Sequence, residues 1–155
     1  MANTYSQITI HLIFAVKNRD YLLQSDFRDE IFMYISSIFK NLNQKLICIN
    51  GIPNHIHILF GLNPDSSISN VVRDVKRFST KFINEKRYLK GKFAWQEGYA
   101  AFSYSRSQRD KVINYINNQE KNHKVKTFKE EYIKLLEKFE IEYKSEYLFN
   151  WLESK

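Results

Sequence analysis

Residues 46–62 read Leu-Ile-Cys-Ile-Asn-Gly-Ile-Pro-Asn-His-Ile-His-Ile-Leu-Phe-Gly-Leu, and this stretch decides the fold. Two apolar runs, 46–52 and 55–62, are rich in isoleucine and are separated by Pro53-Asn54. β-Branched and aromatic residues favour strands, and a proline followed by an asparagine favours a short turn. The stretch therefore predicts an antiparallel β-hairpin.

The segments on either side of this hairpin extend the pattern. Residues 5–16 are rich in β-branched and aromatic residues, and residues 99–105 alternate along the chain, so both predict strands. Apolar residues at helical spacing predict four helices, over residues 25–43, 67–87, 107–122 and 128–139. This order predicts an α+β, ferredoxin-like (split βαβ) fold, a four-stranded antiparallel sheet with helices packed on it.

The sequence also predicts two helix caps, the buried face of one helix and the packing of the segment 147–152. Ser25 and Ser107 are expected to cap the helices that they begin. The buried side of helix 67–87 is expected to consist of Val71, Val75, Phe78 and Phe82. The aromatic end segment 147–152 is expected to dock on the body of the protein or on a partner chain.

The composition limits the class of protein. A chain of 155 residues fits one domain, 1–155, and 43% hydrophobic residues exclude a disordered chain. The sequence has no apolar run of the roughly 20 residues that a membrane span needs, and its N-terminus does not resemble a signal peptide. The single cysteine, Cys48, excludes an internal disulfide and is expected in the core. We therefore expect a cytoplasmic protein.

Positive charge is concentrated in one part of the chain. The formal net charge is +7, and residues 73–92 hold eight basic side chains against two acidic ones. Such a block is typical of a face that binds the phosphates of nucleic acid, although many basic blocks are only solvated helix faces. The residues expected to contact DNA are Arg73, Lys76, Arg77, Lys81 and Arg87.

The second strand of the hairpin carries two histidines, His55 and His57. Residues i and i+2 of a strand point to the same face, so the two imidazoles are expected side by side. Neutral imidazole is a common ligand of divalent ions, and such a pair can form half of a metal site. The alternative is two core or surface histidines without a ligand. His11 is a further candidate near the same site, with a core position as its alternative.

The helix predicted at 107–122 combines apolar and polar residues on one face. Val112, Tyr115, Ile116 and Gln119 share that face by helical spacing. An inward amide needs a partner, and a metal held by His55 and His57 would take the Gln119 carbonyl oxygen as a third ligand. Tyr115, one turn earlier, would lie beside a bound phosphate, although it could also be a core aromatic.

This arrangement predicts a definite chemistry. With Mg²⁺ or Mn²⁺ polarising a DNA phosphate, the phenolic oxygen of Tyr115 would displace the 3′ oxygen. The products would be a 5′-phosphotyrosine and a free 3′-OH, which can reverse the step and join new strands. The group that assists deprotonation of Tyr115 is not evident from the sequence.

Four motifs together resemble a known family. They are the stretches 11–19, 53–57 and 95–103 and the pair Tyr115-x-x-x-Gln119. With them the chain resembles the single-tyrosine, IS200-like transposases of the smallest bacterial insertion sequences, which include the repeat-associated tyrosine transposases of the HUH superfamily. The resemblance implies that His55, His57 and Gln119 bind the metal and that Tyr115 is the nucleophile. It also implies single-stranded DNA substrates with hairpins at the element ends, and a homodimer whose active sites can combine both chains.

Three other interpretations stay open from the sequence. A replication initiator or relaxase can share the histidine pair and the tyrosine, but its motifs often occur in another order. A host-domesticated relative would carry the same residues. A nucleic-acid-binding module of the same fold would carry aromatics instead of histidines on the sheet, and would form no covalent product. Trp95 and Tyr99 could stack on unpaired bases, with packing as the alternative.

Overall fold

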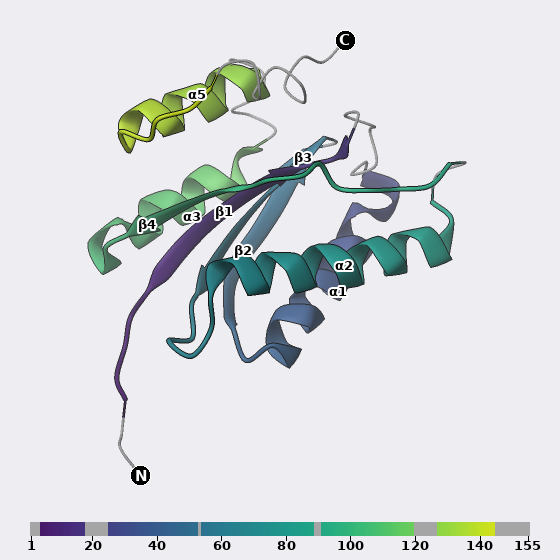
Figure 1. Cartoon of the computed structure of the whole chain (residues 1–155), viewed down its shortest axis with the longest axis horizontal. Coiled ribbons are helices and arrows are strands. Elements are labelled where there is room, and N and C mark those ends of the chain that lie inside the picture. Colours follow the sequence, from purple (N-terminus) through teal and green to yellow (C-terminus); the bar gives the residue numbers. More distant parts are fainter. Residues whose placement is uncertain (1–3, 18–24, 53, 89–90, 120–126, 145–155) are drawn as a thin grey trace.

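The computed structural model describes residues 4–17, 25–52, 54–88, 91–119 and 127–144 (Figure 1). Its sheet contains β1 (Thr9–Ala15), β2 (Lys45–Ile52), β3 (His55–Gly61) and β4 (Ala100–Tyr104). The strands lie in the order β2-β3-β1-β4, and every neighbouring pair is antiparallel. The predicted α+β, ferredoxin-like plan is therefore confirmed.

Two helices cover one face of the sheet, and two others lie on the opposite side (Figure 1). The helices α1 (Ser25–Asn41) and α2 (Ile68–Lys86) pack on the first face. Alternate residues of the strands, such as Leu12, Ile56 and Ile58, are fully buried in that core. The helices α3 (Arg109–Asn117) and α5 (Phe128–Lys138) cover the second face.

The expected buried side of α2 is correct except at Phe78. Val71 and Val75 are buried and Phe82 is partly buried, whereas Phe78 is 37% exposed. At 100° per residue Phe78 falls at the edge of the apolar stripe, and Ser79 takes the inward position. The Ser79 hydroxyl accepts a hydrogen bond of 2.9 Å from Trp95 Nε1, which explains why a serine is buried there.

The expectations for Ser107 and Cys48 are changed, and the open alternative for Trp95 is decided. Ser107 is not an N-cap: Ser105 is the N-cap of a short 3-10 helix, η2 (Arg106–Gln108), which precedes α3, and Gln108 is the N-cap of α3. Trp95 is buried against Phe14 and Phe93, so the packing alternative holds for Trp95. Cys48 is only partly buried, because it lies on the edge strand β2.

Other boundaries are close to expectation. Strand β1 begins at Thr9 rather than at residue 5, and α2 has the N-cap Ser67, whose hydroxyl accepts from the Asn70 amide at 3.1 Å. The cap expected from the Ser25 side chain and the segment 147–152 lie outside the described residues. The helix predicted at 107–122 is shorter than expected, since α3 ends at Asn117 and Asn118 is its C-cap. None of the described helices has both the length and the apolar character that crossing a membrane requires.

Candidate active site

The two histidines of β3 lie on the sheet face that α3 and α5 cover. His55 and His57 are both fully buried, while Ile56 and Ile58 point into the core under α1 and α2. The strand alternation therefore places both imidazoles in one interior space, as the spacing predicted. Their ring centroids lie 5.1 Å apart.

His11 joins this pair from the neighbouring strand. It is fully buried on β1, and its Nε2 lies 2.8 Å from Nδ1 of His57. Burial lowers the pKa of His11 well below 6.5, and the neighbouring His57 lowers it further. Neutral His11 therefore contacts Nδ1 of His57, the ring nitrogen that faces away from the centre of the site. Both predicted alternatives for His11 apply, because it is buried in the core and lies beside the site.

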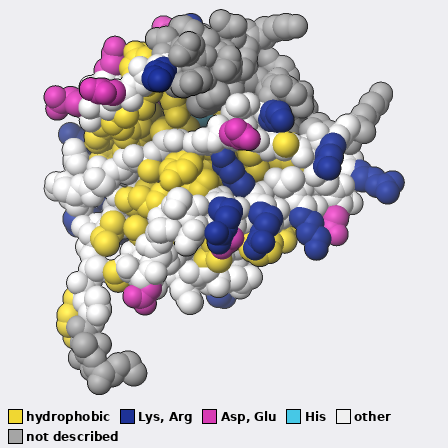
Figure 2. Space-filling model, in the orientation of Figure 1, with side chains coloured by type: hydrophobic (Ala, Val, Ile, Leu, Met, Phe, Trp, Pro, Cys, Tyr) yellow, Lys and Arg dark blue, Asp and Glu magenta, His cyan; other side chains and the backbone are white. Residues whose placement is uncertain are grey.

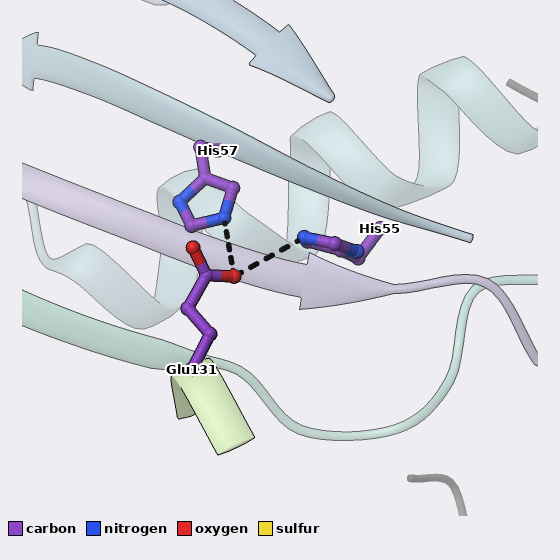
Figure 3. Close-up of side chains that lie close together, drawn as sticks. All are labelled: His55, His57 and Glu131. Carbon is purple, nitrogen blue, oxygen red and sulfur yellow. Dashed lines mark hydrogen bonds and ion pairs between the residues drawn. The ribbon is translucent and has the colours of Figure 1, made fainter. Parts of the chain in front are cut away.

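The centre of the site holds a carboxylate, Glu131 of α5 (Figure 3). Its Oε1 lies 3.4 Å from His55 Nε2 and 3.3 Å from His57 Nε2, and the residue is 6% exposed. Burial by itself raises the pKa of Glu131, but the electrostatic interaction with His57 and hydrogen bonds from both histidines lower it to about 2. Glu131 is therefore ionised within the cluster.

The other oxygen of this carboxylate faces α3. Oε2 accepts a hydrogen bond from the Tyr115 hydroxyl and another, of 3.3 Å, from Gln119 Nε2. The Tyr115 ring stands edge-on to His57, with centroids 5.8 Å apart. One carboxylate thus contacts all four residues that the sequence assigned to the site.

Gln119 presents its other amide atom to the interior. The residue is fully buried, and among the described residues its Oε1 has no hydrogen-bond partner. A buried carbonyl oxygen without a partner is costly unless it binds a ligand. Two imidazole nitrogens and a carboxylate form a donor set that suits a divalent ion such as Mn²⁺ or Mg²⁺, and the buried amide oxygen of Gln119 is a candidate for a further ligand.

Glu131 was not identified from the sequence, although a signal was present. On α5 the apolar face contains Phe128, Tyr132 and Leu136, and Glu131 lies on the same face by helical spacing. A charged residue among buried apolar neighbours needs partners, by the reasoning that singled out Gln119. The same rule, applied to the last helix, points to Glu131.

The basic residues of α2 lie outside this site, on the molecular surface. Figure 2 shows a row of Lys and Arg side chains over α2. Arg73 and Arg77 are 64% and 66% exposed, and both pair with Asp74. Lys81 and Arg87 are exposed as well. Arg73, Arg77 and Lys81 thus form one exposed row at four-residue spacing on α2, Arg87 is exposed at the C-cap that follows, and Lys76 lies apart from them.

Lys76 has a role within the fold. Its Nζ donates to the backbone oxygens of Gln96 and Gly98 at 2.9 Å and 2.7 Å. Burial lowers the pKa of Lys76 to about 8. Lys76 therefore anchors the loop that leads into β4, which makes it the least available of the five residues expected to contact DNA.

Fold and site together define a class of protein. A histidine pair on an inner strand of a ferredoxin-like sheet, faced by a helical tyrosine, is the arrangement expected of single-tyrosine DNA transposases. The chain belongs to this class: residues 4–119 match the family described as "Transposase IS200 like", so this protein is an IS200-like transposase.

Individual relatives agree with this assignment. The ISDra2 transposase TnpA of Deinococcus radiodurans is 25% identical over 118 residues, which cover 73% of this chain and 84% of that relative. A crystal structure of a transposase from Deinococcus radiodurans R1 is similar with a TM-score of 0.61 and 25% identity, covering 77% of this chain and 96% of that one.

A third relative is similar in fold. The structure of a REP-associated tyrosine transposase bound to a REP hairpin has a TM-score of 0.60 at 18% identity, and the match covers 79% of this chain and 73% of that one. Together with the family match, these relatives favour DNA transposition over the replication-initiator and binding-module alternatives.

Proposed function

We propose that this transposase cleaves and rejoins single-stranded DNA through a covalent bond to Tyr115. The observation that carries the proposal is the position of the Tyr115 hydroxyl, in one buried cluster with His55, His57 and Gln119. A tyrosine beside a candidate metal site has the placement that a nucleophile for phosphate transfer requires.

The reaction needs no cofactor that is consumed. The phenolic oxygen of Tyr115 forms a bond to phosphorus, and the bond from phosphorus to the 3′ oxygen breaks. The proton lost by the phenol is balanced by the proton that the leaving 3′ oxygen gains. The products are a 5′-phosphotyrosine and a free 3′-OH. Because the phosphodiester energy is kept in the covalent link, a second 3′-OH can reverse the step and join new strands.

Three residues would hold the divalent ion in this proposal: His55, His57 and Gln119. Two neutral imidazoles and the buried Gln119 Oε1 fit this role. When bound, Mg²⁺ or Mn²⁺ polarises the scissile phosphate and offsets charge on its oxygens. The Phe128 ring covers His55 in this site, since the two rings stack with their centroids 3.7 Å apart.

The proposed substrate is single-stranded DNA that carries a hairpin. The REP-associated relative is described with a REP hairpin bound, and the exposed row on α2 offers cations to a phosphate backbone. The homodimer that the family resemblance implies is part of the proposal. In it each chain would supply its own histidines, tyrosine and glutamine, because these residues meet within one chain here.

One experiment tests the nucleophile. The protein is incubated with end-labelled single-stranded DNA from its flanking genomic hairpins and Mn²⁺ or Mg²⁺, and denaturing gels are searched for a protein–DNA adduct. Wild type and Tyr5→Phe, a control at an 88% exposed tyrosine, are expected to form the adduct, and Tyr115→Phe is not. An adduct of undiminished yield with Tyr115→Phe contradicts the proposal. Binding of the hairpin without any adduct in wild type favours a binding module.

A further inference from the structure

Glu131 lies outside the part of the chain that carries the family resemblance. The family match ends at residue 119, whereas α5 begins at Phe128. The family match therefore says nothing about α5, and the role of this helix in the site rests on the contacts within this chain. The helix brings one carboxylate into the centre of the histidine cluster.

The contacts of Glu131 divide between its two oxygens. Oε1 faces the Nε2 atoms of His55 and His57 at 3.4 Å and 3.3 Å (Figure 3). Oε2 accepts from Tyr115 and from Gln119. The candidate ligand atoms of the two histidines and the carboxylate all lie within 4.8 Å of one another, close enough that together they could hold one metal ion.

The carboxylate also completes the chemistry of the donor set. Two imidazoles and an amide are neutral, whereas Mg²⁺ and Mn²⁺ favour oxygen ligands and negative charge. The Glu131 carboxylate of α5 supplies both an oxygen ligand and a negative charge. Without an ion, the same carboxylate is satisfied by the surrounding hydrogen bonds, so the buried charge is stabilised in either state.

The position of Glu131 is fixed by the packing of its helix. Thr127 caps α5, and its hydroxyl accepts from the Glu130 amide at 3.1 Å. Phe128, Tyr132 and Leu136 are buried against the sheet residues Ile13, Ala15 and Phe102. Glu131 is therefore held in the site by neighbours on either side of it, and it is not a mobile surface acid.

We propose that Glu131 is a ligand of the divalent ion, in addition to His55, His57 and Gln119, and that its second oxygen holds the Tyr115 hydroxyl beside that ion. The inference rests on the metal site of the proposed function and adds α5 to it. In this proposal α5, which follows the residues that match the family, supplies a metal ligand to the active site.

Metal affinity without DNA tests this inference. Mn²⁺ is titrated into the full-length protein by isothermal calorimetry, and binding is checked by the loss of the free-Mn²⁺ electron paramagnetic resonance signal. Glu131→Gln is expected to weaken Mn²⁺ binding about tenfold or more, since the amide keeps the shape but loses the charge. The matched control, Glu137→Gln, changes an exposed glutamate on the same helix and is expected to bind as wild type does.

Other outcomes have a definite meaning. Unchanged or tighter Mn²⁺ binding by Glu131→Gln overturns the inference, because Glu131 would then compete with the ion. If that variant does not fold, Glu131→Asp is titrated instead, and binding equal to that of Glu137→Gln overturns the inference equally. Mn²⁺ binding that is lost in His57→Ala but kept in Glu131→Gln leaves the proposed function standing. Absence of any wild-type DNA adduct overturns the proposed function whatever Glu131 does.

Discussion

At the scale of single residues, the site depends on buried polar groups that satisfy one another. His11, His57 and Glu131 form a continuous chain of contacts, from β1 through β3 to α5. Each of these groups would be costly to bury alone, and each has a partner at hydrogen-bond distance. A substitution of any one of these three residues is therefore expected to affect the residues that contact it.

His11 is expected to act on the metal through His57. If His57 binds the ion through Nε2, its Nδ1 carries the proton and donates it to His11 Nε2, 2.8 Å away. His11→Phe removes this acceptor and keeps an aromatic ring of similar size in the stack. We expect Mn²⁺ affinity to fall about tenfold, measured by calorimetry. Unchanged affinity in a folded variant would show that His11 has only a packing role.

Glu131 is expected to make the free energy of unfolding depend on pH. Its pKa in the folded chain is lowered from 4.5 to about 2, so it contributes stability that is present above pH 4.5. That contribution is lost as the pH falls from 4.5 toward 2. Urea unfolding of the metal-free protein at a series of pH values should show the loss in wild type and a flatter profile in Glu131→Gln. Parallel profiles would contradict the lowered pKa.

At the scale of elements, the hairpin of β2 and β3 determines where the histidines point. Their register pairs Asn50 with His57 and Ile52 with His55, and Gly51 lies between those pairs. The elements predicted from the sequence are mostly correct, because period-2 and helical spacings mark them. The cap at Ser105 was missed although its capping-box partner, Gln108, lies only three residues later in the sequence. Phe78 lies at the edge of the apolar stripe of α2, and its exposure depends on which neighbours the fold brings to that edge.

Gly51 is expected to tolerate no side chain. A Cβ at this position would lie 2.5 Å from the backbone oxygen of His55 on the adjacent strand. Gly51→Ala should lower the free energy of unfolding by about 1–3 kcal/mol and weaken Mn²⁺ binding, because the strand that carries His55 must move. Gly61→Ala is the control, since the nearest atom to its Cβ would be Lys45 Cβ at 3.5 Å. Equal urea stability of the two variants would refute this expectation.

The exposed row on α2 is expected to bind DNA through phosphates. Arg77→Ala should weaken hairpin binding and reduce the slope of log affinity against log salt by about 1. Lys134→Ala, at an exposed position on α5, should leave the slope unchanged. Lys76→Ala is expected to lower stability more than it changes the slope, because its ammonium group is held by Gln96 and Gly98. An unaltered slope in Arg77→Ala would remove α2 from the interface.

At the scale of the whole molecule, the two faces of the sheet have different roles. The face under α1 and α2 is an apolar core, and the face under α3 and α5 holds the histidine cluster. The sequence predicted the sheet, the histidine pair, Tyr115 and Gln119, because each follows from local spacing. It missed Glu131, although helical spacing places this charged residue on the buried side of α5, and the histidines that it meets there come from β3, far away in the sequence.

The proposed reaction leaves Tyr115 covalently joined to DNA. The most direct measurement is mass spectrometry of the adduct after digestion with protease and nuclease. We expect one modified peptide, containing Tyr115 with a 5′-linked nucleotide, in the presence of Mn²⁺ and single-stranded hairpin DNA. A nucleotide attached to any other residue, or cleaved DNA without attachment, would contradict it.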